Sequence, residues 1–195
     1  MDDIRYFAAL LAVVVYPPAV FFWILVHPLT GFWQRIGPAP SYIIIVAILV
    51  GIAMGIYHFR DVILAVDFGT NWLLISLAAI LFGAGMVIEI RCRRQLSFST
   101  LVGLPELKPE SSSVELLKDG IYGQVRHPKY AGAALGLIAI AFFTNYFATY
   151  LLIVICLPAL YLITVLEERE LIDRFGEEYR EYQKNVPRFI PRRSD

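Results

Sequence analysis

The chain has 195 residues, of which 58% are hydrophobic, and its mean hydropathy is +0.63. Soluble domains are about 45–50% apolar, so the composition excludes a soluble enzyme and predicts an integral membrane protein. Lysine and arginine together number 17, as do aspartate and glutamate, so the formal net charge is zero. Because no basic excess exists to neutralise phosphates, the composition also argues against nucleic acid as a partner.

Three stretches of the first half approach the length of roughly 20 apolar residues that a bilayer requires. They cover residues 7–26, 41–57 and 71–90. The first contains Pro17 and Pro18, which should kink a membrane helix without ending it. The acidic start MDDIRY differs from the basic beginning of a signal peptide, so we expect this stretch to form a helix of the mature protein.

The fourth apolar stretch, residues 131–166, is too long for one span. As a single helix it would measure about 54 Å, against a hydrocarbon core of about 30 Å. The polar and aromatic sequence Thr144-Asn145-Tyr146 near its middle predicts a helical hairpin with a tight turn. The sequence therefore predicts an all-α integral membrane fold with five transmembrane helices, of which the last two form the hairpin.

The tail after residue 166 predicts an amphipathic helix. Its apolar residues recur in steps of three or four, the spacing of one helical face: Leu171, Phe175, Tyr179, Tyr182 and Val186. No internal repeat is visible, so we expect a single domain, 1–195. Its parts are the three N-terminal spans, a loop, the hairpin and the tail, which cover in turn residues 1–94, 95–130, 131–166 and 167–195.

Basic residues are concentrated on one side of the predicted bundle. The stretches 91–129 and 167–195 each contain seven lysines and arginines, whereas the connections on the other side contain only Arg5 and Arg60. By the positive-inside rule, the loop, the C-terminus and the amphipathic helix should all be cytosolic.

The loop before the hairpin ends in GIYGQVRHPKYAG, residues 120–132. Pro128 suits the first position of a helix, because the N–H that it lacks would be unpaired there anyway. His127 then lies at or near the N-cap, with Arg126 and Lys129 beside it. Basic residues commonly anchor the start of a membrane helix, so this pattern alone assigns no chemistry.

A hairpin that turns near Asn145 brings Glu167 and Glu168 back to the level of this basic loop. Ionisable residues at a membrane boundary are costly and tend to be functional, and Tyr122 and Tyr130 flank the same place. Two interpretations stay open: a pocket for a zwitterionic or dipolar cofactor, or a structural salt bridge among the same residues.

Metal and thiol chemistry is not expected. Cys92 and Cys156 form no CxxC motif, and His27, His58 and His127 belong to no HExxH motif. Glycines spaced four apart, Gly51 with Gly55 and Gly132 with Gly136, fit close helix approach, and packing within one bundle is favoured over dimerisation.

The string GIYxxVRHPxYAG, a helical hairpin and then EExxLxxxFGxxYxxYxxxVPxxIP resemble the integral-membrane methyltransferases. Within that group the chain is most similar to isoprenylcysteine carboxyl methyltransferase and its prokaryotic relatives, which include phospholipid methyltransferases. The resemblance covers residues 116–191 and implies a site for S-adenosylmethionine. The implied cofactor-binding residues lie before, at the start of and just after the hairpin: Leu116, Leu117, Tyr122, His127, Pro128, Lys129, Tyr130 and Glu167.

The resemblance implies methylation of the α-carboxylate of a membrane-embedded, isoprenylcysteine-like substrate. The eukaryotic relatives have a substrate-binding arginine about one turn before the glutamates, where this chain has Leu160-Tyr161-Leu162-Ile163. Arg91 or Arg126 is the candidate replacement, and Glu168 is a further candidate for positioning the substrate. Arg91 also starts a cluster of arginines that could serve as positive-inside anchors or bind an anionic headgroup.

Three alternatives to carboxyl methylation stay open. A phospholipid N-methyltransferase would need a base for the ammonium of its substrate, and Glu168 is the nearest candidate. A nicotinamide-dependent membrane reductase shares a related C-terminal pattern, and a non-enzymatic scaffold would use the basic loops only as anchors. As a methyltransferase, the chain should act as a monomer on a membrane lipid or prenylated cysteine. Its membrane would be the cell membrane of a prokaryote or the endoplasmic reticulum of a eukaryote.

Overall fold

The computed structural model describes residues 1–95 and 116–191, and every regular element in them is a helix. Helices suit this composition, because in lipid each backbone polar group must find its partner within the chain. The extended pairing in this part of the chain is a single backbone bridge between Asp67 and Tyr146. The helices are α1 (Asp2–Val26), η1 (His27–Leu29), α2 (Thr30–Ile36), α3 (Pro38–His58), α4 (Arg60–Ile63), α5 (Trp72–Arg93), α8 (Pro128–Thr144), α9 (Phe147–Phe175) and α10 (Glu177–Asn185).

Four helical segments are long and apolar enough to cross a membrane: α1 together with η1, α3, α5 and α9. The chain is thus a multi-pass integral membrane protein. α8 is also apolar but has 17 residues, so the fifth span remains a prediction that depends on this shorter helix. Pro17 and Pro18 lie inside α1 without ending it, as expected.

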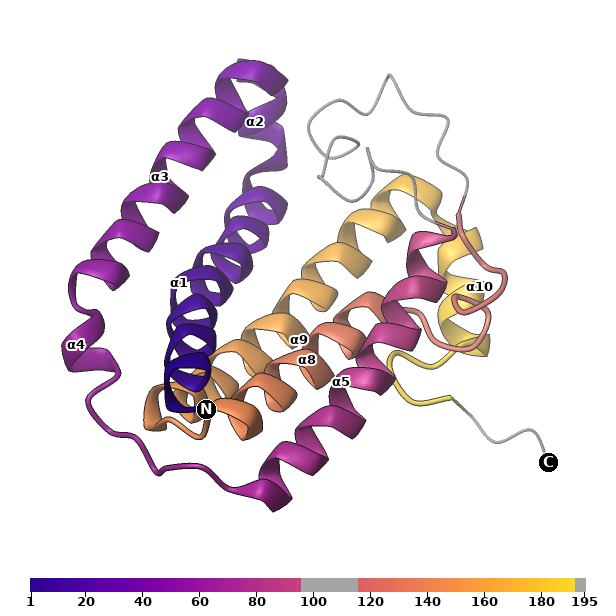
Figure 1. Ribbon diagram of the computed structural model, residues 1–195. Coiled ribbons are helices and arrows are strands. Elements are labelled where there is room, and N and C mark those ends of the chain that lie inside the picture. Colours follow the sequence, from indigo (N-terminus) through magenta and orange to yellow (C-terminus); the bar gives the residue numbers. More distant parts are fainter. Residues whose placement is uncertain (96–115, 192–195) are drawn as a thin grey trace.

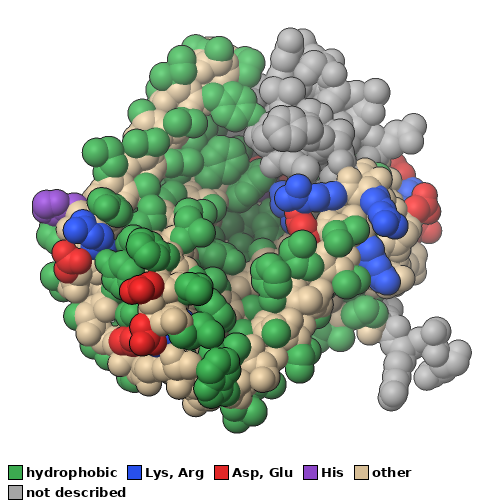
Figure 2. Space-filling model, in the orientation of Figure 1, with side chains coloured by type: hydrophobic (Ala, Val, Ile, Leu, Met, Phe, Trp, Pro, Cys, Tyr) green, Lys and Arg blue, Asp and Glu red, His purple; other side chains and the backbone are tan. Residues whose placement is uncertain are grey.

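The outer surface of the bundle is apolar. α5, α8 and α9 lie side by side, and α3 stands at the edge against α1 (Figure 1). In the most apolar 18-residue stretch of α3, and likewise of α5, only 11% of the residues are buried. Side chains such as Ile43, Met54 and Ile80 are exposed. Figure 2 shows hydrophobic side chains across the middle of the visible face and charged ones toward its two sides. Such an extensive apolar surface fits contact with lipid.

α8 and α9 form the predicted hairpin, which confirms the turn near Asn145. Asn145 adopts the left-handed conformation with a φ of 55°, which asparagine tolerates better than most residues. Its side-chain amide donates a hydrogen bond to the carbonyl oxygen of Gly69 at 2.9 Å. The two arms extend beyond the predicted range 131–166, because the first begins at Pro128 and the second continues to Phe175.

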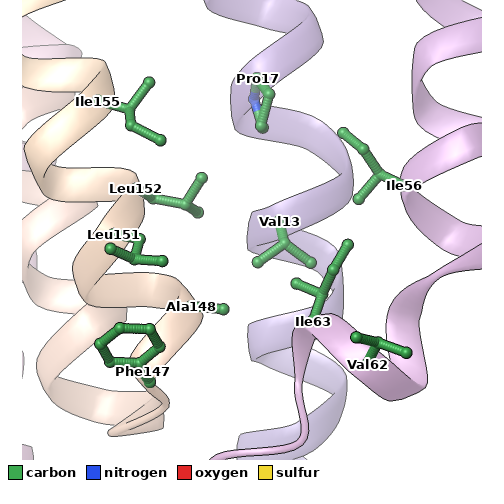
Figure 3. A pocket seen from close by; sticks show the side chains of 10 residues that line it. All are labelled: Val13, Pro17, Ile56, Val62, Ile63, Phe147, Ala148, Leu151, Leu152 and Ile155. Atoms are coloured by element: carbon green, nitrogen blue, oxygen red, sulfur yellow. The ribbon is translucent and has the colours of Figure 1, made fainter.

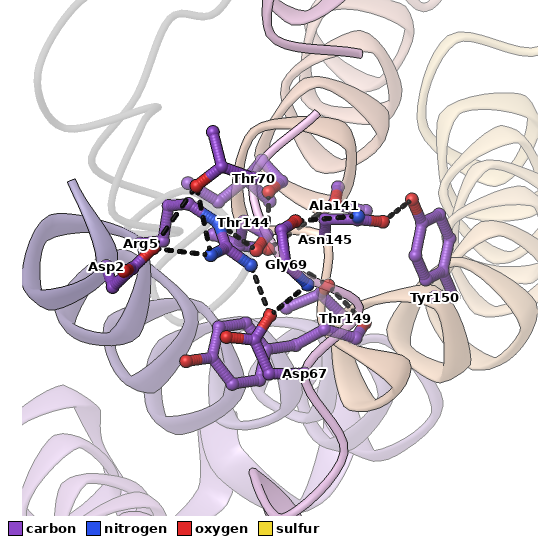
Figure 4. Close-up of polar contacts among 12 residues, drawn as sticks. Asp2, Arg5, Asp67, Gly69, Thr70, Ala141, Thr144, Asn145, Thr149 and Tyr150 are labelled. Atoms are coloured by element: carbon purple, nitrogen blue, oxygen red, sulfur yellow. Dashed lines mark hydrogen bonds and ion pairs between the residues drawn. The ribbon is translucent and has the colours of Figure 1, made fainter. Parts of the chain in front are cut away.

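A buried arginine fixes the end of the bundle where the hairpin turns. Arg5 is 0% exposed, and its Nε donates to the carbonyl oxygen of Thr144 at 3.0 Å. Its guanidinium also pairs with Asp2 and Asp67 (Figure 4). A buried charge is tolerated only when it is paired and hydrogen-bonded. This cluster therefore ties the start of α1 to the segment before α5 and to the hairpin turn.

An apolar pocket of about 360 Å³ lies between α1, α3, α4 and the start of α9 (Figure 3). All ten side chains that line it are hydrophobic, Val13, Ile56 and Leu152 among them. Without a polar side chain this pocket supplies no acid–base or ion-pair chemistry, so the candidate site must be sought elsewhere.

Glycine permits the tight contact between α5 and α8, the most extensive between any two described helices. A Cβ atom on Gly85 would lie 3.2 Å from the carbonyl oxygen of Gly132, and one on Gly132 would lie 3.2 Å from Ile88 Cγ2. The close approach expected at Gly132 is thus confirmed. Packing within the bundle, the favoured use of Gly51 and Gly55, is wrong, since an added Cβ there would meet none of the described residues within 4 Å.

The apolar residues of the tail do not lie on the single amphipathic helix that their spacing predicts, because two helices share them. α9 continues through the glutamates to Phe175, Gly176 ends it with a φ of 60°, and the short α10 follows. Glycine adopts positive φ readily, which explains the break. The predicted apolar side chains nevertheless pack together across it: Leu171, Phe175, Tyr179, Tyr182 and Val186.

Candidate active site

The loop before the hairpin is held against the C-terminal segment. His127 is the N-cap residue of α8 and the buried Pro128 is its first residue, as the sequence predicts. The backbone N–H of Arg126 donates to the carbonyl oxygen of Pro187 at 2.8 Å, and that of His127 donates to Arg188 at 3.0 Å. These two bonds hold the entry to α8 beside the segment that follows α10.

Glu168 is the centre of the polar contacts at this end of the bundle. It is 4% exposed. Its Oε1 accepts hydrogen bonds from Arg126 Nε at 3.0 Å, His127 Nε2 at 2.9 Å and Arg188 Nε at 3.1 Å. Its Oε2 accepts from Gln183 Nε2 at 3.0 Å and from a second nitrogen of Arg188. A carboxylate offers about four lone-pair sites, so these donors saturate it.

Arg126 is committed to the same cluster. Its side chain is 10% exposed, and Nη1 donates to the carbonyl oxygens of Gln183, at 3.0 Å, and of Val186. The second arginine of the cluster, Arg188, also donates to Glu168. That hydrogen bond raises the pKa of Arg188, because it stabilises the charged guanidinium. The structure therefore bonds Arg126 and Glu168, two of the residues considered for substrate positioning, to each other and to the C-terminal segment.

Glu167 has different surroundings from its neighbour. Its Oε2 lies 3.6 Å from His127 Nδ1, which is too long for a hydrogen bond. This oxygen is buried and has no hydrogen-bond partner in the described part of the chain. A buried oxygen without a donor costs about 1–3 kcal/mol, and more when it is charged. A ligand that donates a hydrogen bond would stabilise this position.

Two tyrosine side chains add neutral hydrogen-bonding groups. The Tyr182 hydroxyl donates to the backbone carbonyl of Tyr122. Burial raises the pKa of Tyr122, and the neighbouring Cys92 acts in the same direction. Burial also raises the pKa of Tyr182 to about 12. Both hydroxyls therefore stay protonated at neutral pH.

The first membrane helix contributes to the same end of the molecule. Lys129 Nζ lies 5.3 Å from the centre of the Trp23 ring, and that ring stacks on His27 with the centres 5.3 Å apart. His27 is 4% exposed, and its Nδ1 lies 2.9 Å from Glu170 Oε2. No sequence motif marked Trp23, His27 or Glu170. The available signal was the position of Glu170 three residues after Glu167, which puts both on one helical face.

The other residues implied by the resemblance are spread more widely. The ring of the half-buried Tyr130 lies 5.7 Å from that of His127. Leu116 packs against the cluster that Tyr179, Tyr182 and Val186 form. Leu117 is 37% exposed, and Arg91 is exposed near the end of α5. The described residues contain no group of three or more His, Cys, Asp or Glu side chains that could hold a metal ion.

Comparison with known proteins places these features in a family. Protein-S-isoprenylcysteine O-methyltransferase of Schizosaccharomyces pombe is 35% identical over 77 residues, 39% of this chain and 33% of that protein. Methanethiol S-methyltransferase of Pseudomonas deceptionensis is 37% identical over 73 residues, 36% of this chain and 26% of that protein. The matched segments thus span about a third or less of these curated relatives.

No solved structure matches the chain. The model of the phospholipid methyltransferase family matches residues 73–178, which include α8, His127 and both glutamates of the site. This match confirms the resemblance inferred from the sequence. Because it covers more than half of the chain, the protein belongs to the phospholipid methyltransferase family.

Proposed function

We propose that the chain is an S-adenosylmethionine-dependent methyltransferase that acts on a membrane-embedded, lipid-like acceptor. One observation carries the proposal: His127, at the start of α8, lies against Glu167 and Glu168, near the end of α9. The loop and the acidic pair thereby form one polar site at the end of an apolar bundle, where a soluble cofactor and a lipid can meet. The two relatives, both named as methyltransferases, support methyl transfer.

The residues at this site suit S-adenosylmethionine. Glu167 has a buried carboxylate oxygen that receives no hydrogen bond from the described residues, and the hydroxyl and ammonium groups of the cofactor could supply one. When bound, the cofactor supplies an electrophilic methyl group on a sulfonium. The other residues that would line it come from the loop and the start of α8: Leu116, Leu117, Tyr122, His127, Pro128, Lys129 and Tyr130.

An α-carboxylate of the isoprenylcysteine type is the acceptor that the resemblance favours. Such a carboxyl group has a pKa of about 3.3–3.7 and is ionised at neutral pH, so its methylation needs no base. The protein has to align the carboxylate oxygen within about 3–3.5 Å of the reacting carbon and exclude water. Because Arg126 is occupied by Glu168 and the C-terminal segment, Arg91 is the candidate arginine left to pair with this carboxylate.

A phospholipid amine is the second candidate acceptor, because the matching family is described as phospholipid methyltransferase. An ammonium must lose a proton before its nitrogen can attack, so this reaction needs a base. Glu168 is poorly suited to that role, since side chains from four residues already donate to it. An amine acceptor therefore requires another proton acceptor in the site.

The basic loops favour a cytosolic position for this site, in a cell membrane for a prokaryotic protein or the endoplasmic reticulum for a eukaryotic one. The cofactor would then enter from the cytosol, and the lipid would enter laterally between the helices. One chain supplies every residue assigned to the site, so we expect a monomer to be active.

Ligand titration of the detergent-solubilised protein tests the proposal. S-adenosylmethionine should bind and NADPH should not. Binding of NADPH alone would indicate a reductase, and binding of neither would indicate a scaffold. Labelled cofactor supplied with N-acetyl-S-farnesylcysteine or with phosphatidylethanolamine vesicles then distinguishes a carboxylate acceptor from an amine. Arg91→Gln should raise the KM for the carboxylate alone.

A further inference from the structure

A carboxylate–imidazole pair joins η1, which directly continues α1, to α9. His27 and Glu170 are far apart in the sequence, yet His27 Nδ1 lies 2.9 Å from Glu170 Oε2. The imidazole is almost wholly enclosed, with a side chain that is 1% exposed. A carboxylate can only accept hydrogen bonds, so Nδ1 carries the proton in this bond. In the neutral form of this ring, the lone pair is at Nε2.

This pair lies beside the proposed cofactor pocket. Glu170 follows Glu167 by three residues on α9, so the two side chains share a helical face. The Trp23 ring stacks on His27. The ammonium group of Lys129, at the start of α8, lies over the same ring. Side chains of α1, α8 and α9 thus meet around one place, and the pair belongs to its wall.

Two carboxylate oxygens on this wall point to a ligand. Glu167 Oε2 and Glu170 Oε1 are both buried and have no hydrogen-bond partner in the described part of the chain. A single such oxygen could reflect a local imperfection. Two of them, one helical turn apart and beside a buried imidazole, fit a site that is completed by donors from a bound molecule.

We propose that His27, oriented by Glu170, is the base that accepts the proton of a thiol or ammonium acceptor. This inference rests on the proposed methyltransferase function and specifies its substrate class. As the sulfur or nitrogen of the acceptor bonds to the methyl carbon, the carbon–sulfonium bond breaks and its electron pair remains on the cofactor sulfur. The proton that the acceptor carried passes to His27 Nε2, and Glu170 stabilises the resulting imidazolium. An imidazole held by a carboxylate is a common arrangement for such a base.

Acceptor selectivity in a His27→Gln variant tests this proposal. The wild type and the variant are assayed with methanethiol, with phosphatidylethanolamine vesicles and with N-acetyl-S-farnesylcysteine. General-base catalysis contributes about 10²- to 10⁴-fold, so kcat for the thiol or the amine should fall at least about 100-fold in the variant. Any transfer to the carboxylate, which carries no proton to remove, should fall far less, and added imidazole should restore part of the lost rate. His58→Gln, at the exposed end of α3, is the matched control.

Binding of S-adenosylhomocysteine separates the two hypotheses. His27→Gln should bind it within about threefold of wild type, which also shows that the variant is folded; if it does not fold, Glu170→Gln replaces it and should show the same selective fall in kcat for the thiol or the amine. Wild-type protein that binds neither S-adenosylmethionine nor S-adenosylhomocysteine would refute the proposed function itself. Wild-type protein that binds them but methylates neither thiol nor amine would overturn the base proposal alone. Full activity of His27→Gln on a thiol or amine would overturn it too.

Discussion

Replacing Glu168 with glutamine should destabilise the protein rather than remove one catalytic group. Glu168 and Arg126 are 6% and 10% exposed in their side chains, and His127 is 3% exposed. Removing one partner of such a buried pair costs about 3–5 kcal/mol, because the remaining charge is buried without compensation. The lower end of this range applies, since the glutamine oxygen can still accept a hydrogen bond and Arg188 is partly solvated, at 23% exposed.

We therefore expect a loss of about 3 kcal/mol, which corresponds to a fall of about 6–12 °C in the unfolding midpoint for a chain of this length. The measurement is thermal unfolding of the detergent-solubilised protein, followed by tryptophan fluorescence. The matched control is Glu167→Gln, which changes the adjacent carboxylate without touching the cluster. Its midpoint should stay within about 2 °C of wild type.

The two variants also separate structural from functional roles for the acidic pair. A Glu168→Gln protein with a wild-type midpoint and a lost reaction would refute the structural role and restore Glu168 as a group that acts on the substrate. A large fall in midpoint for both variants would show that the pair acts as one ion cluster, contrary to the distances of the two carboxylates from His127.

Three further changes test other parts of the structure. Glu167→Gln should weaken S-adenosylhomocysteine binding about 10- to 100-fold, because hydrogen bonds to charged groups contribute about 1.5–3 kcal/mol; an unchanged affinity in calorimetry would contradict the assigned pocket. Gly132→Leu should lower the unfolding midpoint by disrupting α5–α8 packing. Gly51→Leu should not, since the new side chain would point into open space. Equal midpoints for the two variants would disprove the close approach. Burial acts to raise the pKa of Asp67, but hydrogen bonds from a backbone N–H and from Arg5 outweigh it and hold the pKa below its usual value. Asp67 thus contributes stability above the usual carboxyl pKa of about 4, and this is lost as the pH falls through the lower folded-state value. The midpoint of the wild type should therefore fall more steeply with acidification than that of Asp67→Asn, and parallel curves would argue against this pairing.

The hairpin was predictable because its signals are local. Residues 131–166 exceed one span, and the only polar interruption lies at the turn, where Asn145 can adopt a positive φ. The contact between His127 and the glutamates then follows because the longer second arm, α9, runs back past the level at which α8 begins. A C-terminal helix boundary was harder to predict, since EERELIDRF consists largely of good helix formers and α9 runs on until Gly176.

The partners of the acidic pair were not predictable from local patterns. Gln183 and Arg188 stand at positions that the tail motif leaves unspecified, and they reach Glu168 only because α10 turns back after Gly176. The pair of His27 and Glu170 depends on how α1 packs against α9, which no spacing within either helix specifies. Hydropathy locates the membrane helices, but it does not determine which of their charged ends meet.

Helical geometry explains how two adjacent glutamates, Glu167 and Glu168, can have different roles. Successive residues of an α-helix point about 100° apart, since 3.6 residues complete a turn. Glu168 therefore faces the C-terminal segment and is saturated there, while Glu167 approaches His127 at the start of α8 and keeps a buried oxygen without a donor among the described residues. Three residues on, Glu170 returns to within about 60° of Glu167, and its partner His27 comes from η1, directly after α1. The carboxylate of Glu168 thus holds the loop before α8 against the C-terminal segment. Those of Glu167 and Glu170, on the other face of α9, are left to bind a ligand and to assist proton transfer.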